Sequence, residues 1–317
     1  MNINKKNYQL NHHAIDNRYN RLNDELKREF GQKVMKLSLD GGFTCPNRDG
    51  RVGDKGCIFC SEEGSGEFAG SRLDSIQEQI EQQKKLLSRK WNTDKYIAYF
   101  QNFTNTYASV DRLRKLYYEA INIEGVVGLA IATRPDCLDE DVLQLLEELN
   151  EKTYLWIELG LQTIHEKSAK FIRRGYPLSI YSEAIEKLKS RNIKTVTHII
   201  IGLPGESSEE ILETVKYVGS TSTWGVKLHS LYIQRATDLY NYYLKNPFYI
   251  MSKEEYVSTV VDAIELLPQD MVVHRVTGDG KKDLLHEPKW SLDKLNVLSM
   301  IDKELKTRNY YQGKNIK

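Results

Sequence analysis

Residues 40–60 read DGGFTCPNRDGRVGDKGCIFC, and this stretch decides the fold. It follows a short apolar run, residues 34–39, that is typical of a β-strand. It places Cys45, Cys57 and Cys60 in one glycine-rich loop, where glycine lets the backbone turn around a bulky group without side-chain clashes. A loop of this kind, directly after a strand, predicts a site built from sulfur ligands.

The spacing of the cysteines leaves three interpretations. Cys57 and Cys60 are two residues apart in the pattern CxxC, which recurs in metal and cluster sites because one tight turn directs both sulfurs inward. With a third thiolate they can hold three corners of a [4Fe-4S] cluster and leave the fourth iron open for a small molecule. A structural zinc site would normally need a fourth ligand, and His12, His13 and Cys137 are distant in sequence. Unligated or redox-active thiols are the third interpretation.

Composition limits the class of protein. A chain of 317 residues with 40% apolar content can bury a large core, as one domain or one domain with extensions. The formal net charge of +1 gives no strong basic field, so an RNA contact would need a local patch. Four cysteines, three of them in one loop, favour a reducing compartment over a disulfide framework. Without a membrane-length apolar run or a signal-peptide core, we expect a cytoplasmic protein with neither membrane nor DNA as partner.

Strand and helix patterns alternate along the chain. The β-rich runs predict strands at residues 34–39, 95–101, 126–132, 154–159, 194–201, 225–233 and 271–276. Apolar periodicity and capping pairs predict helices at residues 16–30, 74–90, 110–121, 138–149, 182–190, 207–218, 252–267 and 292–305. The predicted capping pairs are Asp74 with Gln77, Ser207 with Glu210, and Ser252 with Glu255. Such alternation favours a parallel sheet, either open and doubly wound or closed into a full or partial barrel.

In a parallel α/β fold, functional side chains collect beyond the carboxyl ends of the strands. Neither a dinucleotide-binding glycine fingerprint nor a P-loop stands at any predicted strand end. The polar residues at those ends are Gln101, Thr104, Asn105, Thr133, Arg134, Asp136, Glu158, Gln162, His198, His229 and Arg235. The cysteine loop, residues 40–60, follows the first strand and belongs to the same edge.

Several blocks together resemble the radical S-adenosylmethionine (SAM) superfamily. They are FGQKVMKLSLDGGFTCPNRDG, GCIFC, IATRPDCL, WIELGLQT, FIRRGY and IIGLPGE, between residue 30 and about residue 206. The wide spacing from Cys45 to Cys57 is similar to the branch that contains the radical-SAM domain of the elongator catalytic subunit, and to one small bacterial family in it. The resemblance implies an α/β fold with a partial (β/α)6 TIM-like barrel at residues 34–235. An N-terminal helical cap, residues 1–33, and a C-terminal extension, residues 236–317, would complete the chain.

The resemblance also implies the cofactors and their contacts. Cys45, Cys57 and Cys60 would ligate a [4Fe-4S] cluster, and SAM would chelate its open iron. The further cofactor contacts would be Phe59, Gln101, Thr104, Asn105, Glu158, Gln162, Arg174 and His198. The segment QNFTN at residues 101–105 departs from the Gly-Gly-Glu-like motif that is frequent in the superfamily. Taken alone, Glu158 is equally a structural ion-pair partner, Arg174 a helix end, and His198 a hydrogen-bonded core residue.

The reaction is implied by the same resemblance. SAM cleavage would give a 5′-deoxyadenosyl radical that abstracts hydrogen from the C5 substituent of a tRNA wobble uridine, converting 5-carboxymethylaminomethyl(2-thio)uridine to 5-aminomethyl(2-thio)uridine. Flavodoxin or ferredoxin would supply the electron, and no catalytic residue is identified. A cation should bind the substrate carboxylate, and the candidates are Arg134, Lys227, His229, Arg235 and Arg275.

Two alternatives stand beside this reaction. The first is radical SAM chemistry on a small molecule, similar to that of the oxygen-independent porphyrinogen oxidases. The second is a non-catalytic RNA-binding module with a metal loop. The basic residues near the C-terminus, from Lys281 to Lys317, with Tyr310 and Tyr311 among them, fit an RNA contact as well as a solvated helix and frayed tail.

Overall fold

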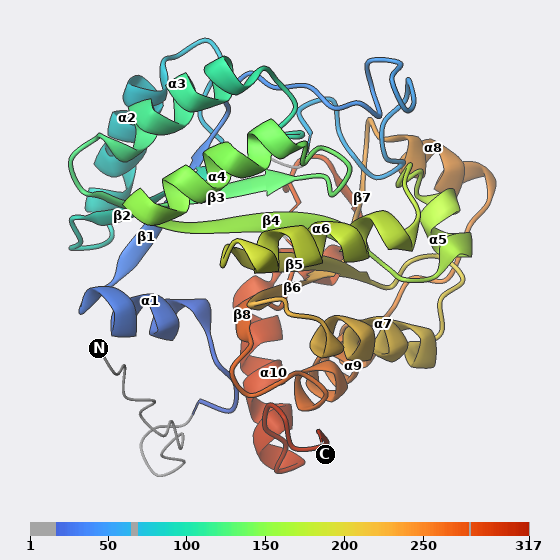
Figure 1. Ribbon diagram of the computed structural model, residues 1–317. Coiled ribbons are helices and arrows are strands. Elements are labelled where there is room, and N and C mark those ends of the chain that lie inside the picture. Colours follow the sequence, from blue (N-terminus) through green and yellow to red (C-terminus); the bar gives the residue numbers. More distant parts are fainter. Residues whose placement is uncertain (1–16, 65–68, 279, 317) are drawn as a thin grey trace.

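The computed structural model describes residues 17–64, 69–278 and 280–316, and its core is one parallel sheet (Figure 1). The sheet has seven strands in the order β1-β2-β3-β4-β5-β6-β8, and each pairs in parallel with its neighbours. They are β1 Val34–Leu39, β2 Lys95–Phe100, β3 Val126–Thr133, β4 Tyr154–Gln162, β5 Lys194–Ile201, β6 Gly225–Ser230 and β8 Val272–Arg275. Because successive strands are added on the same side, the sheet curls into a half-barrel of the predicted TIM-like kind.

Helices cover the outer face of this half-barrel (Figure 1). The principal ones are α2 Ile76–Ser88, α3 Val110–Ile121, α4 Glu140–Lys152, α6 Leu178–Ser190, α7 Ser208–Ser220, α9 Lys253–Glu265 and α10 Lys294–Thr307. Shorter elements are α5 Glu166–Phe171, α8 Asp238–Lys245, the 3₁₀ helix Lys289–Leu292, and a small antiparallel ribbon of β7 Ile233–Gln234 and β9 Leu285–Glu287. None of the helices in the described ranges is both long and apolar enough to cross a membrane.

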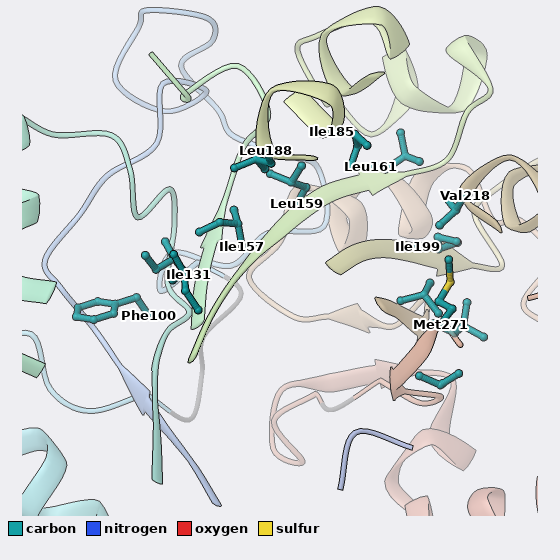
Figure 2. Packing of buried hydrophobic residues seen from close by; sticks show 14 of the residues in the cluster. Phe100, Ile131, Ile157, Leu159, Leu161, Ile185, Leu188, Ile199, Val218 and Met271 are labelled. Atoms are coloured by element: carbon teal, nitrogen blue, oxygen red, sulfur yellow. The ribbon is translucent and has the colours of Figure 1, made fainter. Parts of the chain in front are cut away.

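The strands are buried on both faces, and β4 shows how their side chains divide. Ile157, Leu159 and Leu161 point outward into the main core, where Ile185 and Leu188 of α6 meet them (Figure 2). Trp156, one residue out of phase, belongs to a separate apolar cluster on the inner face. Because side chains alternate along a strand, the residues two and four positions beyond Trp156 also face the interior of the half-barrel.

Helix α1, Leu22–Phe30, closes the amino end of the half-barrel. Leu22 and Leu26 are buried in the same inner cluster as Trp156. The helix ends at Gly31, as predicted, with a left-handed backbone (φ 73°). The residues before Leu22 are not helical, and the predicted first residue, Asp16, lies outside the described ranges.

Two sequence predictions need correction. Helix α2 is capped by Ser75 and Glu78, which form a reciprocal capping box, instead of Asp74 and Gln77. The strand predicted at residues 225–233 is two strands in different sheets, β6 and β7. Its apolar pattern continues because Leu231 and Ile233 are buried in another cluster, between the cysteine loop and α8. The capping boxes predicted at Ser207 and Ser252 are confirmed.

Candidate active site

A cavity of about 400 Å³ opens at the carboxyl ends of the strands. The cysteine loop contributes Cys45, Cys57, Phe59 and Cys60 to its wall. Most of the other predicted site residues also line the cavity, namely Gln101, Thr104, Arg134, Glu158, Gln162, Arg174, His198, Lys227, His229 and Arg275. Residues that are as many as 230 positions apart therefore meet in one space, here called the central cavity.

The cysteine loop is held by its own backbone and by neighbouring elements. Asn47 donates one hydrogen bond from Nδ2 to the Cys57 sulfur (3.6 Å) and another to the carbonyl of Arg173 (2.6 Å). A side chain at Gly53 would collide with Asn47, since its Cβ would lie 2.6 Å from Oδ1. The backbone of Ile58 bonds to the residues after α5 and at the start of α8. The loop is thus fixed between two elements from distant parts of the chain.

The donor set fits an iron–sulfur cluster better than a single metal ion. All three cysteines are free and partly exposed to the central cavity. Burial, together with neighbouring Cys60 and Cys45, raises the pKa of Cys57 to about 12, so the three sulfurs lie within electrostatic reach of one another. In the described part of the chain, no three His, Cys, Asp or Glu side chains converge tightly enough for one ion. Cluster ligands bind different irons and therefore stand farther apart, which disfavours the zinc alternative.

A buried polar cluster lies deeper in the cavity, around Glu158. Its Oε2 accepts hydrogen bonds from the Tyr99 hydroxyl (2.7 Å), from His198 Nε2 (2.8 Å) and from the Lys227 ammonium. Its Oε1 accepts one from the indole of Trp156 (3.0 Å). We call Tyr99, Glu158, His198 and Lys227 the polar cluster. It separates the apolar inner cluster from the open part of the cavity.

Charge fixes the protonation states within the polar cluster. Burial alone would raise the pKa of Glu158, but Lys227 and His198 outweigh it and hold that pKa well below its ordinary value. Burial, helped by the charge of Lys227, lowers the pKa of His198 to about 4. Glu158 is therefore ionised and His198 neutral near neutral pH. Because an ionised carboxylate only accepts, His198 carries its hydrogen on Nε2, and its Nδ1 is left as an acceptor.

Two of the arginines in the cavity wall, Arg134 and Arg174, are largely occupied by hydrogen bonds within the protein. Arg134 pairs with Asp136 through Nε (2.9 Å) and Nη2 (2.7 Å) and donates from Nη1 to the Arg174 carbonyl (2.9 Å). Arg174 donates to the carbonyls of Leu161, Thr163 and Tyr176 and to Glu166. Four of the five N–H groups of Arg174 are thus used, and one remains for the SAM carboxylate that the family resemblance assigns to it.

The segment that follows β2 divides into cavity-facing and structural residues. Thr104 lines the cavity, and its buried hydroxyl has no hydrogen-bond partner in the structure. Asn105 does not line it, since its Nδ2 bridges the carbonyls of Phe100 (3.1 Å) and Ala132 (2.7 Å). Thr104 therefore offers a hydroxyl to a ligand, whereas Asn105 ties the ends of β2 and β3 together. A contact between Asn105 and the cofactor is not supported by its position.

Besides Asn105, a second predicted site residue lies outside the cavity, and one cavity residue was not predicted from the sequence. Arg235 is exposed and is not among the residues that line the central cavity. Tyr99 was missed, although it bonds to Glu158 and lines the cavity. The period-2 pattern could have found it, because Tyr99 lies two positions before Gln101 on the same strand face.

A parallel half-barrel whose first strand leads into a three-cysteine loop beside a deep polar cavity defines a class of iron–sulfur enzymes. The profile of the Radical SAM superfamily matches residues 47–218, and that of the Radical_SAM C-terminal domain matches residues 223–307. The chain therefore belongs to the radical SAM superfamily, whose members use a [4Fe-4S] cluster and SAM.

Individual relatives agree with this assignment. The chain is 47% identical over 299 residues to "Uncharacterized protein YtqA" of Bacillus subtilis, which covers 94% of this chain and 93% of that protein. It is 26% identical over 157 residues to a tRNA uridine(34) acetyltransferase of Methanocaldococcus infernus, covering 48% of this chain and 29% of that protein. The solved structure of the archaeal Elp3 of M. infernus superposes with a TM-score of 0.65 at 19% identity, over 88% of this chain and 64% of that one. The resemblance to the elongator branch is confirmed, and the structural match supports the fold.

Proposed function

We propose that this radical SAM enzyme acts on the wobble uridine of tRNA and converts its 5-carboxymethylaminomethyl group to 5-aminomethyl. The observation that carries the proposal is that one cavity combines the three-cysteine loop with an interior rich in positive charge. Its described wall contains Arg48, Arg134, Arg174, Lys227 and Arg275 but a single carboxylate, that of Glu158. An anionic nucleotide whose C5 substituent carries a carboxylate fits such a wall. The similarity to a tRNA uridine(34) acetyltransferase supports the same substrate class.

The residues of the cavity fall into cluster ligands and SAM contacts. Cys45, Cys57 and Cys60 would hold the cluster. SAM would be contacted by other residues that line the same cavity, namely Phe59, Gln101, Thr104, Gln162, Arg174 and His198. When bound, the cluster and SAM supply a 5′-deoxyadenosyl radical that abstracts hydrogen from an unactivated carbon. The walls exclude water and hold the uridine substituent still, which is the protein's main contribution to radical chemistry.

The substituent itself favours this reaction. Loss of hydrogen from the methylene between nitrogen and carboxylate gives a carbon radical stabilised by both neighbours. That radical would pass one electron to the oxidised [4Fe-4S] cluster and lose the N–H proton to give an imine. Water would hydrolyse the imine to glyoxylate and leave the aminomethyl group on the uridine. Flavodoxin or ferredoxin is the proposed source of the electron that starts the reaction.

In the C-terminal part, Arg308 contributes little to RNA binding, since it already pairs with Asp262 and Glu304.

The test is a nucleoside mass analysis of bulk tRNA from cells that lack the gene. The cells are complemented with wild type or with Cys60→Ala, which removes one cluster ligand. We expect 5-carboxymethylaminomethyl-uridine to accumulate and only the wild type to relieve it. An unchanged nucleoside profile would refute the tRNA reaction and direct attention to small-molecule substrates. Iron and sulfide content, with SAM-dependent release of 5′-deoxyadenosine, would then separate such an enzyme from a non-catalytic module.

A further inference from the structure

Strand β6 presents two polar side chains to the central cavity whose hydrogen-bonding capacity the described residues do not fully use. The buried ammonium of Lys227 donates to Glu158 and to the Tyr99 hydroxyl (3.0 Å), which leaves one of its three N–H groups without a partner among the described residues. Two positions further on, His229 faces the same side, and its Nε2 is buried without any hydrogen-bond partner in the structure. Unpaired buried polar groups are costly, so two of them side by side indicate a ligand.

Arg275 adds a second positive charge at this place. It stands directly opposite Lys227 in the register of β6 and β8 and also lines the central cavity. Burial lowers the pKa of Lys227 to about 7 against the attraction of Glu158, and the charges of Lys36 and Arg275 lower it further. The cations on these neighbouring strands therefore repel one another. An anion placed between them would relieve that repulsion.

The other candidate cations are less suited to this role. Asp136 already pairs with Arg134 through two hydrogen bonds. Arg235 is exposed outside the cavity. Arg174 has a single N–H group left after its bonds to three carbonyls and Glu166.

We propose that Lys227, His229 and Arg275 form the subsite for the carboxylate of the substrate's C5 substituent. The inference rests on the proposed function and deepens it, because it names the groups that distinguish substrate from product. The polar cluster positions Lys227 in advance, so little side-chain entropy is lost on binding. The carboxylate is anchored next to the carbon that loses hydrogen. The aminomethyl product lacks this group and is released more readily.

The experiment compares three anticodon stem-loop RNAs that differ only at C5 of the wobble uridine. The substituents are carboxymethylaminomethyl, its uncharged carboxamide, and aminomethyl. Affinities are measured by fluorescence anisotropy on the cluster-reconstituted protein under anaerobic conditions without SAM, so that no turnover occurs. We expect the wild type to bind the carboxylate RNA about tenfold more tightly than the carboxamide RNA, the effect of one or two charge-assisted hydrogen bonds.

Variants then locate the preference. His229→Leu and Arg275→Gln should bring the ratio of carboxylate to carboxamide affinity close to one and leave binding of the aminomethyl RNA unchanged. Lys227→Met alone would leave the buried Glu158 carboxylate unpaired, so it is combined with Glu158→Gln, and thermal unfolding verifies the fold. Arg235→Gln is the matched control, a cation outside the cavity, and should keep the wild-type ratio.

Each other outcome overturns the proposal. Equal binding of carboxylate and carboxamide RNA by the wild type would do so, as would variants that weaken all three RNAs alike. Variants that instead weaken SAM binding, measured by calorimetry, would assign the subsite to the cofactor. The cellular nucleoside profile tests the reaction separately. Accumulated 5-carboxymethylaminomethyl-uridine without a carboxylate preference in vitro would refute the subsite alone.

Discussion

Glu158 shows how much one buried side chain decides in this protein. Four donors converge on its carboxylate, from strands β2, β4, β5 and β6. Removal of one partner from a buried ion pair costs several kcal/mol, typically about 3–5, because the remaining charge is left in a poor environment. Glu158 therefore stabilises the half-barrel and keeps Lys227 and His198 in fixed orientations toward the cavity.

The low pKa of His198 makes stability depend on pH. Its pKa is lowered from 6.5 to about 4 in the folded protein. Between these pH values the unfolded chain binds a proton on His198 and the folded protein does not. The contribution of His198 to the free energy of unfolding is therefore fully present above about pH 6.5 and is lost as the pH falls toward 4. The loss amounts to about 3 kcal/mol when the two values are compared. The variant His198→Gln keeps an amide that can donate to Glu158 but does not titrate. Urea unfolding should show that its free energy of unfolding falls less between about pH 7 and about pH 4 than that of the wild type.

Two other buried histidines also titrate, so the effect of His198 is the difference between wild type and variant. Burial also lowers the pKa of His229 and His274, and both contribute to the acid sensitivity of wild type and variant alike. Only the difference between the two proteins belongs to His198. An identical pH dependence in both would show that His198 accepts a proton in the folded protein as easily as in the unfolded chain.

The start of α2 offers two adjacent residues that could cap the helix. Both Asp74 and Ser75 are good capping residues, but the structure uses Ser75, whose hydroxyl accepts from the Glu78 backbone (3.2 Å). Ser75→Ala should lower the free energy of unfolding by about 1 kcal/mol, as loss of an N-cap does. Asp74→Ala is the control, since the Asp74 carboxylate accepts a hydrogen bond from exposed Gln82 and does not cap the helix. It should cost less than about 0.5 kcal/mol. Chemical denaturation measures the free energy of unfolding of both variants. A larger loss for Asp74→Ala than for Ser75→Ala would show that Asp74 caps the helix.

The segment after β6 illustrates an element that a local pattern could not divide. Apolar residues recur through residues 225–233, GVKLHSLYI, and such a β-rich segment is typical of one strand. The chain instead leaves the sheet after Ser230, and residues 233–234 pair with β9, more than 50 positions further on. Burial in two different clusters gives the same sequence signal as burial in one.

In the assembled molecule, residues 18–20 lie against the C-terminal segment, residues 309–316. Gln312 is buried, and its Oε1 accepts from the backbone of Asn20 (2.8 Å) while its Nε2 donates to the carbonyls of Met271 (2.7 Å) and Pro268. Its backbone N–H donates to Arg18 (2.9 Å). A frayed C-terminal tail, one of the two interpretations of this segment, therefore does not describe residues 309–316. The N-terminal cap and the C-terminal segment are held in one structure.

This junction predicts a large effect from a residue far from the cavity. Gln312→Leu would leave three backbone groups without partners and should cost about 2–3 kcal/mol of unfolding free energy. Ile316→Ala, an exposed apolar residue in the same segment, should cost less than about 0.5 kcal/mol. Urea titration followed by tryptophan fluorescence measures both. Equal, small effects would show that the two ends are held together mainly by other contacts.

Three features could be predicted from the sequence, namely the alternation of strands and helices, the parallel sheet and the three-cysteine loop. These follow from local patterns, because the periodicity of apolar residues and the spacing of cysteines do not depend on the rest of the chain. The sequence also placed Glu158, His198 and Lys227 on strands, but it could not bring them together. Their contact depends on the curl and register of the sheet, which aligns His198 with Lys227 and Lys227 with Arg275.

Which cations are available in the cavity depends on the fold as a whole. Arg134, Lys227 and Arg235 were equal candidates in the sequence, yet Arg134 is paired with Asp136 and Arg235 is exposed outside the cavity. The physical reason is that a charge acts through its partners and its burial, and both are set by residues far away in the chain. The closing of the half-barrel by α1 and the bond network of Gln312 are decided in the same way, by contacts across the whole length of the molecule.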